Sequence, residues 1–168
     1  MENFVSMPTI SPDLLGEDAP RGDLHLRFEL GGKARFAFPA SGVVEVVELS
    51  TPQITALPNT SPALIGTFNL RGEIIWILDL EFCMQDSLFQ NTTQTFPMIV
   101  IQEGEHLIGL AVYAIQGMVW LKTEEIAPSQ SPLPFVCGQI EEEEILILDP
   151  AAILTSQCWA QKTPLLTH

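Results

Sequence analysis

Clustered acidic side chains are the first feature of this sequence that could do chemistry. Residues 141–144 are four consecutive glutamates, and a reaction that needs paired carboxylates could use them. Asp79 and Asp149 follow two apolar runs at matched places and could form a second acid pair. Simpler roles are available, because the glutamates lie between two apolar strand-like segments and each aspartate is placed to cap a helix. We therefore expect a solvated acidic turn and two helix caps.

The sequence gives no further support to the hypothesis that the protein is an enzyme. The chain contains no glycine-rich phosphate loop, no nucleophile elbow and no histidine beside a motif-embedded serine or cysteine. A hydrolase that used Asp79 or the glutamate run would lack a base, a nucleophile and a metal set. We predict that the protein is not an enzyme, and the hydrolytic hypothesis ranks last.

Metal and disulfide chemistry are also disfavoured by spacing. The cysteines and histidines are scattered along the chain: Cys83, Cys137, Cys158, His25, His106 and His168. The odd number of cysteines and the lack of short paired spacings argue against a disulfide framework and a structural zinc site. We expect reduced thiols, exposed histidines on strands, no metal site and no cofactor.

One basic residue is better placed for recognition. Arg71 is the only lysine or arginine between Arg35 and Lys122, and it stands beside Gly72 at a turn between two apolar runs. A guanidinium can bind a carboxylate through two parallel hydrogen bonds. Arg71 is therefore a candidate partner-binding residue. An internal ion pair that pins the turn, with Glu45 as a candidate acid, is the alternative, and the two roles are compatible.

The overall charge restricts the partners. The 168 residues include 21 acidic and 7 basic side chains, which gives a formal net charge of -14. Such a charge opposes binding to nucleic acid and to anionic membrane surfaces. No apolar run approaches the roughly 18 residues that span a bilayer, and the N-terminus lacks a signal-peptide pattern. The sequence predicts a cytoplasmic protein without direct membrane insertion.

The elements that must position these residues are mostly strands. Residues 1–22 contain three prolines and no sustained period, so we expect a flexible leader. From residue 24 to residue 30 apolar and polar side chains alternate, which predicts a half-buried strand and then a hairpin at Gly31-Gly32. Residues 43–49 are rich in β-branched side chains and predict a third strand. Residues 74–78 are wholly apolar, which favours a strand covered on both faces.

The second half of the chain repeats the first. Gly66 and its run to Asp79 are echoed by Gly138 and its run to Asp149, at an offset of about 70 residues. Many short strands with glycine and proline turns agree with two small related β-barrels. We expect an all-β folded unit over residues 23–154, built from two related β subdomains with short helices, and a C-terminal tail over residues 155–168.

A block of residues around Arg71 also resembles the CheW-like family of chemotaxis coupling proteins. The block runs from Pro58-Asn59 to the sequence Asn69-Leu70-Arg71-Gly72, with Leu64 where the family has isoleucine. Weaker matches accompany it: Val43-Val44-Glu45, the strand that ends at Asp79-Leu80, residues 109–112, Leu121 with residues 124–126, and the closing residues 138–154. The resemblance covers roughly residues 23–154.

This resemblance implies two packed five-stranded SH3-like barrels and a non-enzymatic adaptor. The implied partners are the CheW-like regulatory domain of a CheA-type histidine kinase and the cytoplasmic tip of a methyl-accepting chemoreceptor, at membrane receptor arrays. The implied pathway is chemotaxis or a related pilus or phototaxis-like motility pathway. The partner-binding residues that we carry over, or infer near the receptor-facing groove, are Val43, Glu45, Gly66, Asn69, Leu70, Arg71, Gly72, Tyr113 and Ile115.

The chain departs from the family pattern at the proline-containing leader and at two aromatic residues. Tyr113 stands where the family usually has aspartate, and Trp76 stands where it often has proline. Tyrosine is frequent in interface hot spots, so receptor preference is the feature most open to change. For Val43, ordinary strand packing is as good an explanation as partner contact. An alternative function is a β-barrel that binds a hydrophobic small molecule, with Trp76 and Trp120 lining its cavity.

Overall fold

The computed structural model describes residues 4–5, 22–31, 34–58, 62–85 and 95–155 and is built mainly of strands. The strands are β1 (Phe4–Val5), β2 (Asp23–Glu29), β3 (Arg35–Pro39), β4 (Val43–Ser50), β5 (Leu64–Leu70), β6 (Glu73–Asp79), β7 (Thr95–Glu103), β8 (His106–Ala111), β9 (Ala114–Leu121), β10 (Val136–Ile140) and β11 (Ile145–Leu148). The helices are α1 (Leu80–Gln85), α2 (Pro150–Thr155) and the 3₁₀ turns η3 (Ala40–Gly42), η4 (Thr51–Gln53) and η5 (Thr123–Glu125).

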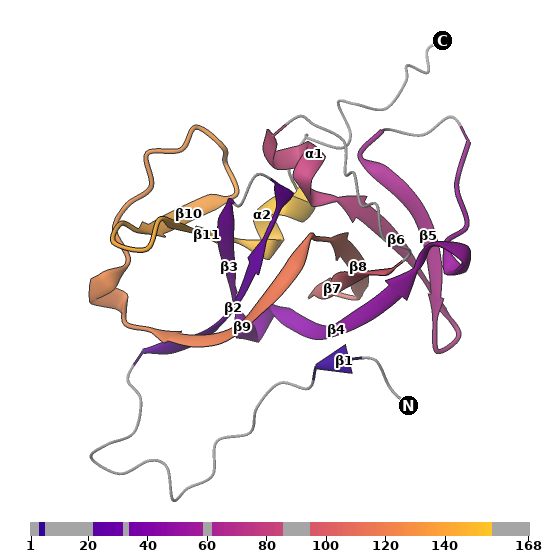
Figure 1. Cartoon of the computed structure of the whole chain (residues 1–168), viewed down its shortest axis with the longest axis horizontal. Coiled ribbons are helices and arrows are strands. Elements are labelled where there is room, and N and C mark those ends of the chain that lie inside the picture. Colours follow the sequence, from indigo (N-terminus) through magenta and orange to yellow (C-terminus); the bar gives the residue numbers. More distant parts are fainter. Residues whose placement is uncertain (1–3, 6–21, 32–33, 59–61, 86–94, 156–168) are drawn as a thin grey trace, which may run out of the picture.

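The strands form two sheets that lie side by side, as Figure 1 shows. The first sheet has six strands in the order β1-β4-β7-β8-β6-β5, and the second has five in the order β10-β11-β3-β2-β9. The predicted all-β fold is confirmed. The pairing among the described strands does not close either sheet into a continuous barrel. Within the described residues, the two edges of each sheet are linked only by an isolated bridge, Thr55 to Thr67 in the first sheet and Ala127 to Gln139 in the second.

The two sheets contain equivalent hairpins. The hairpin β5–β6 adds to β8 in parallel, and the hairpin β10–β11 adds to β3 in parallel. In the first hairpin Gly66 pairs with Ile77 next to a register shift, and in the second Gly138 pairs with Ile147 next to another. Both hairpins therefore use the same backbone design at opposite ends of the long axis of the molecule in Figure 1.

Three apolar clusters hold the sheets together. One, which we call the intersheet core, combines Phe28 and Phe38 of the second sheet with Ile99 and Leu110 of the first, all fully buried. The ring centroids of Phe28 and Phe38 are 5.2 Å apart in a stacked arrangement. A second cluster lies within the first sheet and a third within the second sheet. Each sheet is thus apolar on both faces over much of its area.

This double coverage explains one wrong prediction about exposure. His25, on β2, was expected to be exposed, but only 3% of its surface is accessible. The face of β2 that carries His25 lies opposite the intersheet core, on the side of the cluster within the second sheet, which includes Ala37 and Leu121. One ring nitrogen has a local hydrogen-bond partner, because Nδ1 lies 2.9 Å from the backbone oxygen of Asp23. His106 is exposed, as expected.

A second wrong prediction concerns β6, which was expected to be covered on both faces. Ile75, Ile77 and Leu78 are fully buried, but Ile74 is 58% exposed and Trp76 is 44% exposed. The intersheet core includes Leu78 but neither exposed residue. In Figure 1 the β5–β6 hairpin extends beyond the second sheet, so nothing among the described elements covers the end of β6 next to its turn.

The structure of the N-terminal segment agrees only partly with the sequence prediction. Phe4 and Val5 lie within the predicted leader, yet they form a short strand that pairs antiparallel with β4. The rest of residues 1–21 lies outside the described residues, and so do residues 156–168 of the predicted tail. Flexibility of both segments stays a prediction.

Candidate functional site

The turn between β5 and β6 is built by every residue of the Asn69-Leu70-Arg71-Gly72 sequence. Leu70 pairs with Glu73, which leaves Arg71 and Gly72 as a two-residue hairpin loop. Their φ angles are 50° and 90°, and positive φ at both positions defines a type I′ turn. The Asn69 side-chain oxygen accepts a 2.8 Å hydrogen bond from the Gly72 backbone N–H. The sequence therefore folds into a tight turn that holds Arg71 in a fixed orientation.

Arg71 forms an ion pair with Glu45 on β4. The guanidinium Nη2 donates to Glu45 Oε1, and the side chains are 66% and 9% exposed respectively. Glu45 lies opposite Val100 on β7, whose side chain belongs to the cluster within the first sheet. The carboxylate is thus held at the end of an apolar interior, where an unpaired charge would be costly. The predicted internal ion pair is present, and two thirds of the arginine surface stays available to a partner.

The other carried-over residues around this turn are buried. Val43 is 6% exposed and belongs to the intersheet core. Gly66 is required by a close backbone approach, since a Cβ there would lie 2.4 Å from the backbone oxygen of Thr55. These two residues, like Glu45, lie beneath the surface and support it, so in the free protein they offer little area for direct contact with a partner.

The exposed part of the site includes two residues that the sequence interpretation assigned to the interior. Ile74 and Trp76 stand on the same face of β6, immediately after the Arg71 turn. Trp76 pairs with Thr67 on one side and with Ile108 on the other. Arginine and tryptophan are both enriched in interface hot spots, and both are exposed on this hairpin. The uninterrupted apolar run could have signalled this, because a strand that is apolar on both faces can have one face reserved for a partner.

Tyr113 and Ile115 occupy a different place. Tyr113 follows β8, is 53% exposed and donates its backbone N–H to the Glu29 oxygen at 3.0 Å. Ile115 on β9 is half-buried against the intersheet core. Since β8 runs parallel to β6 and Ala111 pairs with Asp79, Tyr113 lies beyond the end of β6 that is remote from Arg71. Seven strand residues separate the ends of β6 by about 20 Å, at roughly 3.3 Å per residue.

The acidic residues have the structural roles expected of them. Asp79 Oδ1 accepts from the Phe82 backbone N–H at 3.1 Å, and Asp149 Oδ1 accepts from the Ala151 N–H at 3.1 Å, so both cap short helices. Residues 141–144 form the exposed turn between β10 and β11. The hypothesis that these acids are catalytic gains no support from this geometry.

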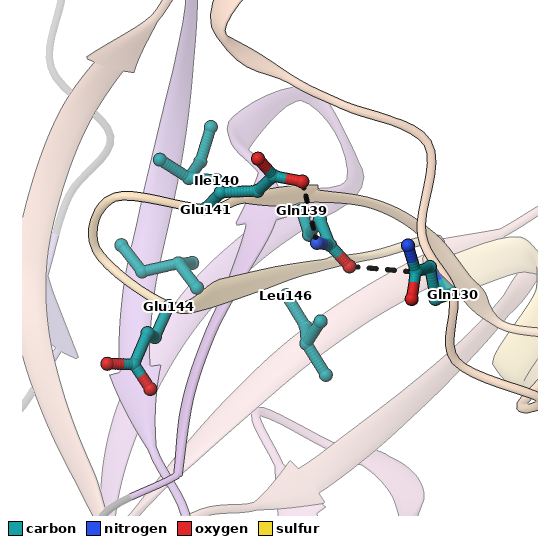
Figure 2. Close-up of a pocket in the computed structure, with 7 residues that line it drawn as sticks. Gln130, Gln139, Ile140, Glu141, Glu144 and Leu146 are labelled. Atoms are coloured by element: carbon teal, nitrogen blue, oxygen red, sulfur yellow. Dashed lines mark hydrogen bonds between the residues drawn. The ribbon is translucent and has the colours of Figure 1, made fainter.

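A pocket of about 420 Å³ lies beside the acidic turn. Figure 2 shows Gln139 between Glu141 and Gln130: its Nε2 donates to Glu141 Oε2 at 3.5 Å, and its Oε1 accepts from the Gln130 backbone N–H at 3.4 Å. Leu146 supplies an apolar wall. These amides and carboxylates can accept hydrogen bonds, but the lining contains no nucleophile and no base of the histidine or lysine type.

Two cysteines, Cys83 and Cys137, lie within the described residues. Partial burial raises the pKa of the Cys137 thiol on β10, and the nearby Asp149 charge acts in the same direction, so the thiol stays protonated at neutral pH. Cys83 is buried. Over the described ranges, no group of three or more histidine, cysteine or acidic side chains is arranged to hold a metal ion. The helices described within those ranges are too short or too polar to cross a bilayer.

The hydrophobic-ligand alternative loses one of its two aromatic residues. Trp76 faces the surface of the first sheet instead of an interior cavity, and the interior of that sheet is filled by Ile75, Ile77 and Met98, all fully buried.

Comparison with known proteins adds three findings. Residues 25–158 match the sequence profile of the CheW-like domain. The chain is 26% identical over 114 residues to the chemotaxis protein CheW of Klebsiella aerogenes, which covers 62% of this chain and 67% of that protein. The fold is similar to the crystal structure of the scaffolding protein TtCheW from Thermoanaerobacter tengcongensis, with a TM-score of 0.66 and 23% identity over 76% of this chain and 89% of that one.

Proposed function

This chain belongs to the CheW-like domain family, and from that premise we propose that it is a non-catalytic adaptor that couples chemoreceptor-type sensors to a CheA-type histidine kinase. An adaptor must bind two partners at once, so it needs two separate surfaces. The observation that carries the proposal is the separation of Arg71 from Tyr113, which lie beyond opposite ends of β6.

The first surface is the end of the first sheet around Arg71. The type I′ turn presents the guanidinium, and Ile74 and Trp76 add exposed apolar area on the strand that follows the turn. Because the ion pair with Glu45 restrains the arginine before binding, less conformational entropy is lost when a partner carboxylate contacts it. We assign this surface to the CheW-like regulatory domain of the kinase.

The second surface is the β8–β9 connection around Tyr113 and Ile115. The tyrosine ring is more than half exposed, while its backbone is fixed by the hydrogen bond to Glu29. A rigid aromatic side chain of this kind provides large contact area at small entropic cost. We assign this surface to the cytoplasmic tip of a methyl-accepting chemoreceptor, which would recruit the adaptor to membrane receptor arrays.

Val43, Glu45 and Gly66 support the first surface by position. Val43 anchors the start of β4, Glu45 holds Arg71, and Gly66 lets the chain after β4 approach β5. Substitutions at these buried positions are expected to reduce kinase binding through displacement of the turn.

The test is affinity isolation from native cell extract with the wild-type chain and two charge variants, followed by binding assays with the purified partners. Arg71→Glu is expected to lose the histidine kinase and retain the receptor, whereas Tyr113→Glu is expected to show the reverse. Each loss should be about 30-fold or more in Kd, as for interface hot spots. Glu143→Lys, a charge reversal in the other exposed turn, is the control and should retain both partners.

Thermal unfolding of each variant separates loss of binding from loss of folding. The coupling proposal fails if the folded wild-type chain captures neither a kinase nor a receptor at low ionic strength. The assignment of the two surfaces fails if both variants lose the same partner.

A further inference from the structure

The outer edge of β4 is the most unusual edge in the molecule, because the chain covers it with its own N-terminal residues. β4 pairs with β7 along its whole length, from Val43 to Ser50. On its other side β1 contributes two pairs, Phe4 with Val47 and Val5 with Val46. Figure 1 shows β1 lying along this edge, away from the rest of the sheet. The described strands leave positions 44–45 and 48–49 of that edge without a strand partner, whereas the backbone N–H groups of Val43 and Ser50 donate to Ala40 and Gln53.

An open strand edge is a template for another strand. Its unpaired N–H and C=O groups can bind an extended segment through backbone hydrogen bonds, a recognition mode called β-augmentation. β1 is direct evidence of the chemistry that this edge accepts, namely an extended segment with two apolar residues, antiparallel to β4. Val44, which is 40% exposed near the same edge, adds uncovered apolar surface.

The pairing of β1 is weak enough to be exchanged. Two residue pairs contribute few hydrogen bonds, each of which stabilises the folded state only modestly. Pairing of β1 also fixes the separation between β1 and β2, which follow one another along the chain, and the entropy lost by this closure offsets much of the gain. A partner strand that spans more of β4 would form more hydrogen bonds and would displace β1.

The charge next to the paired residues defines the partner more closely. Glu48 follows Val47 on β4 and is exposed. In the register of β1, an incoming strand places the residue before its two apolar residues directly opposite Glu48. Opposite charges at such cross-strand positions are stabilising, and like charges are destabilising. The net charge of -14 favours a basic segment in the same sense.

We propose that the edge of β4 is a docking site for an extended segment of a partner protein that carries a basic residue directly before two apolar residues, and that Phe4–Val5 occupies this site in cis. The site does not depend on the kinase and receptor assignments made above. It gives the N-terminal residues a role as an exchangeable cover of one binding edge.

The test uses the full chain and synthetic peptides. The probes are a fluorescent peptide with the sequence of residues 1–8 and two versions that carry Asn3→Lys or Asn3→Glu, and Kd is measured by fluorescence anisotropy. In the chain, Val5→Pro removes a backbone donor and weakens the cis strand, while Thr9→Pro adds the same residue outside the paired positions and serves as the control. The peptides are expected to bind Val5→Pro about tenfold more tightly than the wild type or the control, because the cis competitor is lost.

A charge swap tests the register. The lysine peptide is expected to bind about fivefold more tightly than the glutamate peptide, and Glu48→Lys in the Val5→Pro chain should reverse that order. Glu48 is exposed, so this substitution leaves the fold unchanged. Absence of peptide binding to the Val5→Pro chain would overturn the docking site. Equal binding of the lysine and glutamate peptides to both chains would overturn the register and the basic character of the partner.

Discussion

The β5–β6 and β10–β11 hairpins occupy equivalent positions in the two sheets, yet their turns carry opposite charges. The first turn has two residues, Arg71 and Gly72, and its arginine is tied to Glu45. The second turn has four glutamates, all exposed. The strands keep the same parallel addition, the same register shift and the same glycine position in both halves. The two hairpins thus share their strand pairing and differ in the length and charge of their turns.

The largest difference between the hairpins should come from their equivalent glycines. A Cβ at Gly66 would meet the backbone oxygen of Thr55 at 2.4 Å, whereas a Cβ at Gly138 would meet a methyl group of Ile126 at 2.5 Å. Backbone cannot rotate away, but an isoleucine side chain can. We expect Gly66→Ala to lower the free energy of unfolding by about 3 kcal/mol and Gly138→Ala by about 1 kcal/mol. Urea denaturation measures both, and equal losses would contradict the distinction.

The ion pair should make the first turn more sensitive to neutralisation than the second. Arg71→Gln leaves the Glu45 carboxylate nearly buried without its cation, and we expect a loss of about 1 to 2 kcal/mol, reduced by the solvent exposure of the arginine. Glu143→Gln in the acidic turn should change stability by less than about 0.5 kcal/mol.

A double-mutant cycle with Glu45→Gln and Arg71→Gln isolates the pair itself. The expected coupling free energy is about 1 kcal/mol, measured by chemical denaturation of the four chains. A coupling near zero would mean that the pair positions Arg71 without stabilising the fold.

The same substitution should have opposite signs in the two turns. Arg71 and Glu144 both have positive φ, 50° and 56°, and asparagine adopts this conformation more readily than either. Glu144→Asn also removes one of four adjacent negative charges, so we expect a gain of about 0.5 kcal/mol. Arg71→Asn gains the same backbone relief but loses the ion pair, and the net result should be a loss. Melting temperatures of both variants check the signs.

The smallest expected effect concerns a thiol on the second hairpin. β10 carries Cys137 where β5 carries Ile65, about 70 residues earlier. Burial first, and Asp149 second, raise the pKa of Cys137 above its ordinary value of 9.0. Below that value the thiol is protonated in both folded and unfolded chains. As the pH rises past it, the unfolded chain ionises first, so this group's contribution to stability falls.

Alkylation by iodoacetamide reports the same property. Asp149→Asn keeps the hydrogen-bond acceptor of the helix cap but removes the charge, and should speed alkylation of Cys137 at pH 9 by about twofold. Peptide mass mapping separates this site from Cys83 and Cys158. An unchanged rate would show that burial alone sets the reactivity.

Local sequence patterns determined much of this molecule. Alternation predicted β2, β-branched side chains predicted β4, the offset between Gly66 and Gly138 pointed to the two equivalent hairpins, and Asp79 and Asp149 were correctly placed as helix caps. The sequence left two compatible roles open for Arg71, partner binding and an internal ion pair with Glu45, and the structure contains the ion pair. Apart from this ion pair, which joins β4 to the turn after β5, these features depend on contacts within a strand, a turn or a hairpin, and residue types alone encode such contacts.

Tertiary structure decided which of the apolar and polar faces meet solvent. The exposure of Ile74 and Trp76, the burial of His25 and the pairing of Phe4–Val5 with β4 all contradict or exceed what local pattern suggested. So does the separation of Tyr113 from Arg71 along β6. The alternation of side chains along a strand tells which of them share a face. Whether that face is covered depends on where the other sheet ends and on the curvature of each sheet. That information lies in the packing of residues distant in sequence.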